Sequence, residues 1–188
     1  TLIKAPLENI IKKNIQEQDT KEDLNIMDQN VNRLLDLTKQ LLDFRKAERD
    51  GMMLNFEKCN INNIIHGVFI RFTSLMREKN IESDITLPME PLFAYVDKEA
   101  LTKIISNLLN NAVKYCERSL SIELSSKEDK FNIVIRNDGK LVQPSMREEI
   151  FTPFVRGNDV ASSTNGTGIG LALARTLAEL HSGTFNMV

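Results

Sequence analysis

The chain of 188 residues has little cysteine, a small net charge and no long apolar run. Its two cysteines, Cys59 and Cys116, lack metal-ligand spacing, so we expect reduced thiols in a cytosolic compartment. No apolar stretch approaches the roughly 18 residues of a membrane span, and we identify no signal peptide. The formal charge of −2 argues against a surface that coats nucleic acid. These absences favour a globular protein, and 41% hydrophobic residues suffice for a real core.

Three asparagines, Asn107, Asn110 and Asn111, lie within the most regular helical pattern of the chain, residues 98–115. Asn is less favourable than Ala inside a helix by roughly 0.5 kcal/mol, so three in five residues suggest another role. Apolar residues at helical spacing form one face, and Asn107, Asn111 and Lys114 fall on the opposite side. Amide oxygens suit Mg²⁺, and a lysine suits the phosphate oxygens that accompany it. A solvated helix face is the alternative, and this helix alone does not decide between them.

A glycine-rich segment, residues 166–170 with the sequence Gly-Thr-Gly-Ile-Gly, runs into an apolar-periodic helix expected at 171–180. Glycines let successive N–H groups face one point, and a helix N-terminus favours anions, so the segment suits phosphate. It is neither a dinucleotide fingerprint nor a Walker P-loop, because the spacing and the Gly-Lys-Ser/Thr ending are wrong. An ordinary turn before a helix is the alternative.

Two further segments lie between these elements. Residues 131–136 alternate as a strand and end in the turn signal Asn137-Asp138-Gly139, whose simplest interpretation is a hairpin or exit turn. Residues 150–154 place two phenylalanines beside a proline, directly before the polar run 157–165. We expect the phenylalanines to pack in the core at the base of this run, which would then form a flexible lid over a nucleotide.

Together these segments resemble the motifs of sensor histidine kinases, in the family's order and at its approximate spacing. Residues 107–115 resemble the N box, 137–139 a variant G1 box, 150–154 the F box and 166–170 the G2 box. Residues 32–48 resemble the second dimerisation helix of bacterial hybrid two-component sensors, which carry their own receiver domain. The resemblance covers nearly the whole chain.

The apolar pattern predicts two domains, a helical hairpin at 1–50 and a catalytic ATP-binding domain at 51–188. A heptad seam from 24 to 41 predicts a helix of about 26 residues, with 1–15 as its partner and the charged residues 16–22 as the turn. Two helices leave apolar surface open, so two copies should pair as a homodimer through residues 1–50 in a four-helix bundle. The alternative is a hairpin packed on its own catalytic domain.

The fold class is therefore expected to be α+β. The second domain should be a two-layer α/β sandwich with helices on one face of a mixed sheet, which the resemblance identifies with the Bergerat type. In order we expect a strand after Leu54, helix 62–79, strands 81–87 and 92–96, helix 98–115, a hairpin through 127–130, a short helix, the lid and the last helix.

The resemblance implies that both ends are clipped. The phosphoaccepting histidine would lie upstream of Thr1, and the family continues beyond Val188 into another strand pair. Neither His66 nor His181 suits the acceptor role, and we expect both to be structural or solvated.

The resemblance also implies a site for ATP and Mg²⁺. Asn111 would hold Mg²⁺ with help from Asn107, Lys114 would neutralise phosphate charge, and Tyr115 would pack beside the adenine; Asn107 and Lys114 would be catalytic. The remaining nucleotide-binding residues would be Asn137, Gly139, Gly166, Thr167, Gly168, Gly170 and Leu171.

This chain departs from the family's G1 box at two positions. Asn137 stands where the family commonly has Asp, so its hydrogen bond to the adenine amino group should be weaker. Leu141 replaces a glycine and should stiffen the loop. The register could also be one residue out, with Asp138 contacting the adenine and Asn137 capping the turn.

The function implied is the ATP-dependent protein histidine kinase core of a two-component system. It would transfer the γ-phosphoryl group to the upstream histidine and then to an aspartate of a response-regulator receiver domain, so the chain as given should not autophosphorylate. The alternative is a nucleotide-binding regulatory or scaffold module; the heptad hairpin argues against a gyrase-like or mismatch-repair ATPase. The chain should be the cytoplasmic portion of an inner-membrane sensor, with membrane contact only through other parts of the parent protein.

Overall fold

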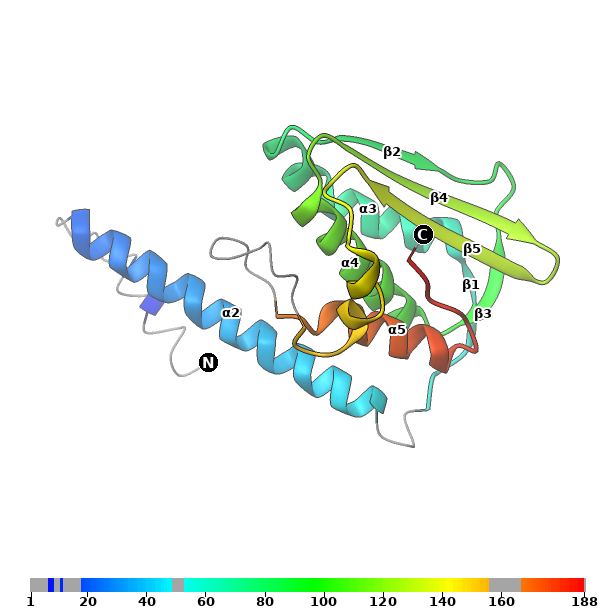
Figure 1. Ribbon diagram of the computed structural model, residues 1–188, viewed down its shortest axis with the longest axis horizontal. Helices are drawn as coiled ribbons and strands as arrows, with labels where there is room; N and C mark the ends of the chain where they lie inside the picture. The colour runs from blue at the N-terminus through cyan, green and yellow to red at the C-terminus, as the bar shows by residue number, and fades with distance from the viewer. Residues whose placement is uncertain (1–6, 9–10, 12–17, 49–52, 156–166, 188) are drawn as a thin grey trace. The chain divides into compact units, whose positions relative to one another are not determined.

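The computed structural model describes residues 7, 8, 11, 18–48, 53–155 and 167–187. The chain divides into two compact units, residues 1–43 and 44–188 (Figure 1). The helices are α2 (Gln18–Glu48), α3 (Ile61–Glu78), α4 (Lys98–Tyr115) and α5 (Gly170–Leu180), with short 3-10 helices η1 (Pro144–Met146) and η2 (Glu149–Phe151). The strands are β1 (Glu57–Asn60), β2 (Glu82–Thr86), β3 (Phe93–Val96), β4 (Ser119–Lys127) and β5 (Lys130–Asn137).

Helix α2 is 31 residues long and begins at Gln18, so the turn expected at 16–22 was placed too far along the chain. Gln, Lys and Glu are good helix formers, and acidic residues are favourable near a helix N-terminus, so a charged stretch does not by itself end a helix. The expected helix 1–15 lies mostly outside the described residues, within which Leu7, Glu8 and Ile11 are helical. No helix in the described ranges has both the length and the apolar character to cross a bilayer.

Helix α2 keeps much of its apolar seam on the surface. The large apolar side chains that remain exposed are Ile26, Met27, Leu34, Leu35, Leu41 and Leu42. An amphipathic helix gains most of its stability by burying its apolar stripe. The described part of the chain does not bury this one.

The strands form two separate sheets instead of the single mixed sheet that we expected. In the larger sheet β4 lies between β2, which is parallel to it, and β5, which is antiparallel. The smaller sheet pairs β1 with β3 in antiparallel register. Alternation of apolar and polar residues indicates that a segment is a strand, but it does not specify the strand's partner, and this is why the expectation failed.

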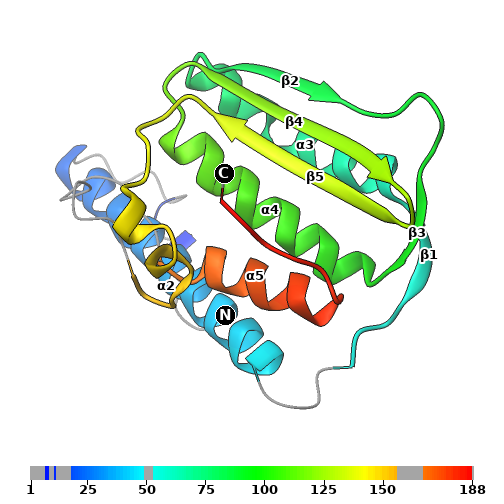
Figure 2. The ribbon, with the colours of Figure 1, turned by 45° about the vertical axis from the view of Figure 1, so that its right-hand side comes forward.

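The core of the second unit lies between the larger sheet and helices α3 and α4, which cover one of its faces (Figure 2). On β4 the side chains of Leu120, Ile122 and Leu124 are buried, and the residues that alternate with them are more exposed. Helix α5 packs against α4. The fully buried side chains of this core include Ile61, Ile65, Val68, Ile105, Leu109, Ile122, Ile169 and Leu177.

Asp97 starts helix α4. Its Oδ1 accepts a hydrogen bond from the Ala100 N–H at 2.9 Å, and its Oδ2 accepts one from the Asn55 N–H at 2.9 Å. Burial raises the pKa of Asp97, but these two bonds and one from Glu99 outweigh burial, so the pKa is lowered overall. The carboxylate therefore stays charged at neutral pH and caps the helix.

His181 links the end of α5 to the same point. Its Nε2 accepts the Asp97 N–H at 3.1 Å, and its Nδ1 lies 2.7 Å from the Leu177 carbonyl oxygen. Because Nε2 accepts this hydrogen bond, Nδ1 is the nitrogen that donates to the carbonyl oxygen. His181 thus has the structural role expected from the sequence, and His66 is exposed on α3.

Replacing Asp97 by Ala should lower the free energy of unfolding by about 1–2 kcal/mol, because the N-terminal N–H groups of α4 lose their acceptor. Asp97→Asn, which keeps a capping oxygen, should lose less. Urea unfolding followed by circular dichroism measures the difference. Asp129→Ala in the exposed β4–β5 turn is the control and should change stability by less than about 0.5 kcal/mol; equal losses from Asp97→Ala and the control would contradict the capping role.

Candidate functional site

Helix α4 carries the three asparagines in different environments. Asn107 and Asn111 are half-buried, whereas Asn110 is exposed. The Asn107 Oδ1 faces the start of α5, since a β-carbon at Gly170 would lie 3.1 Å from it. Asn107 therefore lies on the flank of α4 against which α5 packs, and Asn111, one turn further on, shares that flank. The two amides lie at the margin of the apolar face, and not opposite it as the sequence pattern had predicted.

The start of α5 lies beside Asn107 and has no side-chain cap among the described residues. The helix begins at Gly170. Gly168 has a φ of +71°, and a β-carbon there would lie 2.9 Å from the Phe154 Cα. An uncapped helix N-terminus with glycines before it favours an anion.

The two sides of the expected lid are joined at their bases. The Phe154 N–H donates to the Gly168 carbonyl oxygen at 2.9 Å, and the Thr167 Oγ1 accepts the Ile169 N–H at 3.2 Å. Both phenylalanines of 150–154 were expected in the core, but only Phe151 is buried; Phe154 is 62% exposed. Phe154 has a φ of +68°, and this backbone turn accompanies its outward position.

Two of the predictions made for this region fall outside the described residues. They are the nucleotide contact of Gly166 and the lid at 157–165. Leu171, another predicted contact, lies in the first turn of α5 and is half-buried.

The C-terminal end of α4 meets the turn after β5. A β-carbon at Gly139 would overlap the Tyr115 carbonyl oxygen and would lie 2.8 Å from the Asn137 Nδ2. The Lys114 Nζ lies 4.7 Å from the centre of the Tyr115 ring. The structure thus brings together Asn137, Gly139, Tyr115 and Lys114, and only glycine fits at position 139. Leu141, which replaces a glycine of the family pattern, is 92% exposed.

Asp138 is a residue whose partners sequence reasoning missed. Its Oδ1 accepts the N–H groups of Glu117 and Arg118, each at 3.0 Å, and its Oδ2 accepts the Arg118 N–H at 3.1 Å. The hydrogen bond from Arg118, followed by those involving Ser119, Cys116 and Glu117, holds the pKa of Asp138 well below its usual range. The carboxylate is engaged by the turn after α4, so this side chain does not face the Asn137 side of the strand end.

The Cys116 thiol joins the same group. Its Sγ lies 3.1 Å from the Ser119 carbonyl oxygen and 3.3 Å from the Asp138 Oδ1. Burial and the neighbouring Asp138 carboxylate raise the pKa of Cys116, so the thiol stays protonated and donates. The Asn-Asp-Gly sequence predicts a turn, but it does not predict that Asp138 binds residues about 20 positions earlier in the chain.

Helix α4 therefore carries two places suited to a ligand, one at its middle and one at its C-terminal end. Asn107 and Tyr115 are eight positions apart, about 12 Å along a helix axis. The C-terminal end offers an amide and an aromatic ring beside a glycine turn, and the middle offers amide oxygens beside an uncapped helix N-terminus. This arrangement suits an elongated ligand with a polar ring at one end and anionic groups at the other.

The donor set also fits Mg²⁺ accompanied by phosphate. Asn107 and Asn111 supply hard amide oxygens, and the structure gives neither side chain a hydrogen-bond partner among the described residues. The described ranges contain no cluster of three His, Cys, Asp or Glu side chains suited to a metal. Mg²⁺ commonly completes its shell with substrate phosphates and water, so one or two protein oxygens suffice.

Gly139→Ala should destabilise the protein by about 1–3 kcal/mol, because the new methyl group overlaps the Tyr115 carbonyl oxygen and forces the turn away from α4. Gly67→Ala is the matched control: a β-carbon there meets nothing within 4 Å in the middle of α3. It should stabilise by about 0.5–1 kcal/mol. Thermal or urea unfolding measures both, and a Gly139→Ala protein as stable as wild type would refute the close approach.

Comparison with known proteins relates part of the second unit to a described family. Residues 96–187 match the family model described as "Histidine kinase-, DNA gyrase B-, and HSP90-like ATPase". Hybrid signal transduction histidine kinase D of Dictyostelium discoideum is 30% identical over an alignment of 192 positions, which covers 97% of this chain and 12% of that protein. The chain thus spans only a small part of the length of such curated relatives.

Solved histidine kinases share the fold. The catalytic domain of ThkA is 26% identical with a TM-score of 0.61, over 67% of this chain and 81% of that one. ThkA in complex with the response regulator TrrA gives 23% identity and a TM-score of 0.70, over 96% and 51% of the two chains. Full-length ShkA in complex with AMPPNP gives 22% identity and a TM-score of 0.74, over 94% and 38%.

The matched region contains α4, the turn after β5 and the start of α5, which are the elements that build the candidate site. Residues 96–187 therefore form an ATPase domain of the histidine kinase-, DNA gyrase B- and HSP90-like family, and the curated relatives that match the chain over most of its length are histidine kinases.

Proposed function

We propose that this chain is the catalytic core of a protein histidine kinase that binds ATP with Mg²⁺ along helix α4. The observation that carries the proposal is the position of α4 between two glycine segments. Gly170 abuts Asn107 at the uncapped start of α5, and Gly139 abuts Tyr115 at the end of α4. The phosphates would lie at the first place and the adenine at the second.

Each residue of the site has a proposed role. Asn111 and Asn107 hold Mg²⁺ through their amide oxygens, and Lys114 places a positive charge near the phosphates. Asn137 accepts a hydrogen bond from the adenine amino group, and Tyr115 packs beside the base. Backbone N–H groups around Gly168 and Gly170 bind phosphate oxygens, with Gly166, Thr167 and Leu171 contributing to the same pocket.

The phosphoryl transfer that follows needs positioning and charge stabilisation. When bound, Mg²⁺ supplies neutralisation of the charge on the phosphates. The residues of this chain orient the nucleotide so that its γ-phosphoryl group meets the acceptor imidazole. Asn107 acts at that end of the site, and Lys114, whose Nζ lies 4.7 Å from the centre of the Tyr115 ring, would extend its charge toward the phosphates from the adenine side.

We place the acceptor histidine upstream of Thr1. His181 is unsuited because both its ring nitrogens are engaged, with Asp97 and Leu177. His66 lies on α3, which carries none of the proposed site residues. The second transfer would go to an aspartate of a response-regulator receiver domain, a proposal that the ThkA complex with TrrA supports by analogy.

The hybrid organisation and the homodimer are part of the same proposal. The uncovered apolar seam of α2 supports pairing of two copies through residues 1–50. The name of the D. discoideum relative supports a hybrid parent protein. Contact with an inner membrane would come only from parts of the parent outside this chain, which would itself lie in the cytoplasm.

Asn111→Ala should weaken binding of Mg²⁺-ATP by about tenfold, because an amide oxygen proposed to hold the metal is lost. Asn110→Ala is the matched control, since Asn110 is the adjacent residue of the same helix and is exposed. Isothermal calorimetry with ATP, with and without Mg²⁺, measures both variants. The asparagines do not form the metal site if the affinity of Asn111→Ala matches that of Asn110→Ala.

The alternative to a kinase core is a regulatory nucleotide-binding module, and the changes at Asn137 and Leu141 in the G1 box favour that alternative. A phosphorylation assay separates the two. With [γ-³²P]ATP, the chain as given should bind nucleotide without labelling. A longer chain that includes the proposed histidine should acquire acid-labile, base-stable phosphate, and Asn111→Ala should abolish it. ATP binding without labelling of the longer chain would favour the regulatory module.

A further inference from the structure

Asp138 lies outside the set of residues assigned to the nucleotide, yet its carboxylate holds the turn that joins α4 to β4. Three donors converge on it, the N–H groups of Glu117 and Arg118 and the thiol of Cys116. Its own N–H donates to the Ser119 carbonyl oxygen at 3.2 Å. We call this set of bonds between Asp138 and residues 116–119 the clasp.

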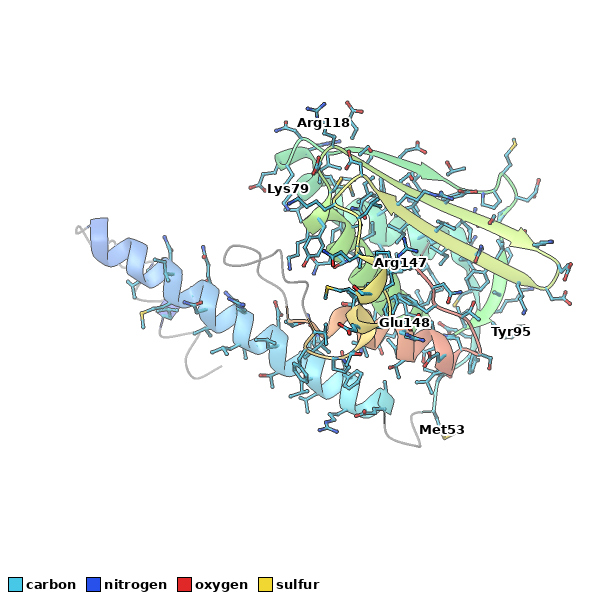
Figure 3. The ribbon with its side chains drawn as sticks, in the orientation of Figure 1. Met53, Lys79, Tyr95, Arg118, Arg147 and Glu148 are labelled. Carbon is cyan, nitrogen blue, oxygen red and sulfur yellow. The ribbon has the colours of Figure 1, made fainter. Side chains whose placement is uncertain are left out.

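The clasp joins two elements that each carry part of the proposed adenine site. Tyr115 is the residue directly before the turn, and Asn137 and Gly139 are the residues on either side of Asp138. The turn lies at the end of the sheet where Arg118 is labelled in Figure 3, and the Arg118 carbonyl oxygen also accepts the Glu82 N–H at 2.7 Å. Any shift of Asp138 along the turn would therefore move Asn137 and Gly139 relative to Tyr115.

We propose that Asp138 is a positioning residue that sets the register of Asn137 against the end of α4 and thereby determines the preference of the site for adenine. Successive side chains at a strand end point to opposite sides, so anchoring Asp138 in the turn directs Asn137 away from it. This inference rests on the proposed function of the site as an ATP site.

The chemistry of the clasp requires a carboxylate. Every partner of the Asp138 side chain is a donor, and an ionised carboxylate only accepts. An asparagine would present one oxygen and an NH₂ group, and the NH₂ would face an N–H. The clasp is also solvent-exposed, where charge-assisted hydrogen bonds compete with water better than neutral ones.

A turn that merely stabilises the fold would behave differently. Its loss would lower the free energy of unfolding and weaken all nucleotides equally, because each would bind to a smaller folded fraction. Loss of register would instead reduce the preference for adenine over guanine, since it displaces the one side chain proposed to contact the base edge. The ratio of the ATP and GTP dissociation constants separates these two roles.

The test measures that ratio by calorimetry for wild type, Asp138→Ala and Asp138→Asn, with Mg²⁺ present and below the unfolding temperature of each. Asp138→Ala should reduce the ATP preference by about tenfold, and Asp138→Asn should fall between it and wild type. Asn137→Ala should show a similar loss of preference. Glu117→Ala is the matched control, because it removes a carboxylate from the same turn and keeps the backbone N–H that the clasp uses.

The Cys116 thiol gives a second readout that does not depend on nucleotide. In a Cys59→Ser background, Cys116 is the one cysteine left in the chain, so iodoacetamide alkylation reports on it alone. Asp138→Ala should speed alkylation several-fold, because the thiol loses its acceptor and the nearby charge that raises its pKa. Glu117→Ala should leave the rate unchanged.

The outcomes separate this inference from the proposed function. If wild type binds neither ATP nor GTP, the proposed function fails and the inference fails with it. If wild type prefers ATP and the preference survives in Asp138→Ala with faster alkylation, the clasp has opened without loss of selectivity, and the inference alone is overturned. If Asp138→Ala does not fold, the ratio in Asp138→Asn decides: a value equal to wild type overturns the inference.

Discussion

The rotation of α4 about its own axis is the constraint on which the rest of the second unit depends. Ile105 and Leu109 are both 0% exposed, so the helix cannot turn without exposing them. Burying such side chains contributes roughly 2 kcal/mol each, which is far more than the preference of an amide for any single orientation. The core thus determines where Asn107 and Asn111 lie, and their position at the margin of the apolar face follows from packing.

Polar links hold the two ends of the same helix. At its start the Asp97 carboxylate caps the first turn, and the Asp97 N–H donates to His181 at the end of α5. At its end the turn that follows Tyr115 is bound by Asp138 at the end of β5. The apolar middle sets the rotation of α4, and these links set the positions of its neighbours α5 and β5. The two glycine segments of the site belong to those same neighbours, so the links position the glycines as well.

How much of this was predictable from the sequence depends on whether the information was local. The bounds of α4 agree with the predicted 98–115 because apolar spacing is a local signal, and the hairpin at 127–130 was found for a similar reason. The separation of β1 and β3 from the larger sheet was not found, since strand pairing depends on the whole topology. The boundary expected at 16–22 failed because charged residues are compatible with a helix.

The G1-like turn shows why neighbouring polar residues could not be assigned by type alone. Asn137 and Asp138 can both accept a hydrogen bond, so each could stand at an adenine-reading position or cap a turn. The structure engages the carboxylate with N–H groups of residues 117 and 118, and the strand's alternation then leaves the amide for the other side. The stronger acceptor thus holds the backbone, and the weaker one is left for the adenine contact that we propose. This explains how the chain can have Asn where its family resemblance predicts Asp: the charge stands one residue along, where it orders the turn that positions Asn137 and Gly139.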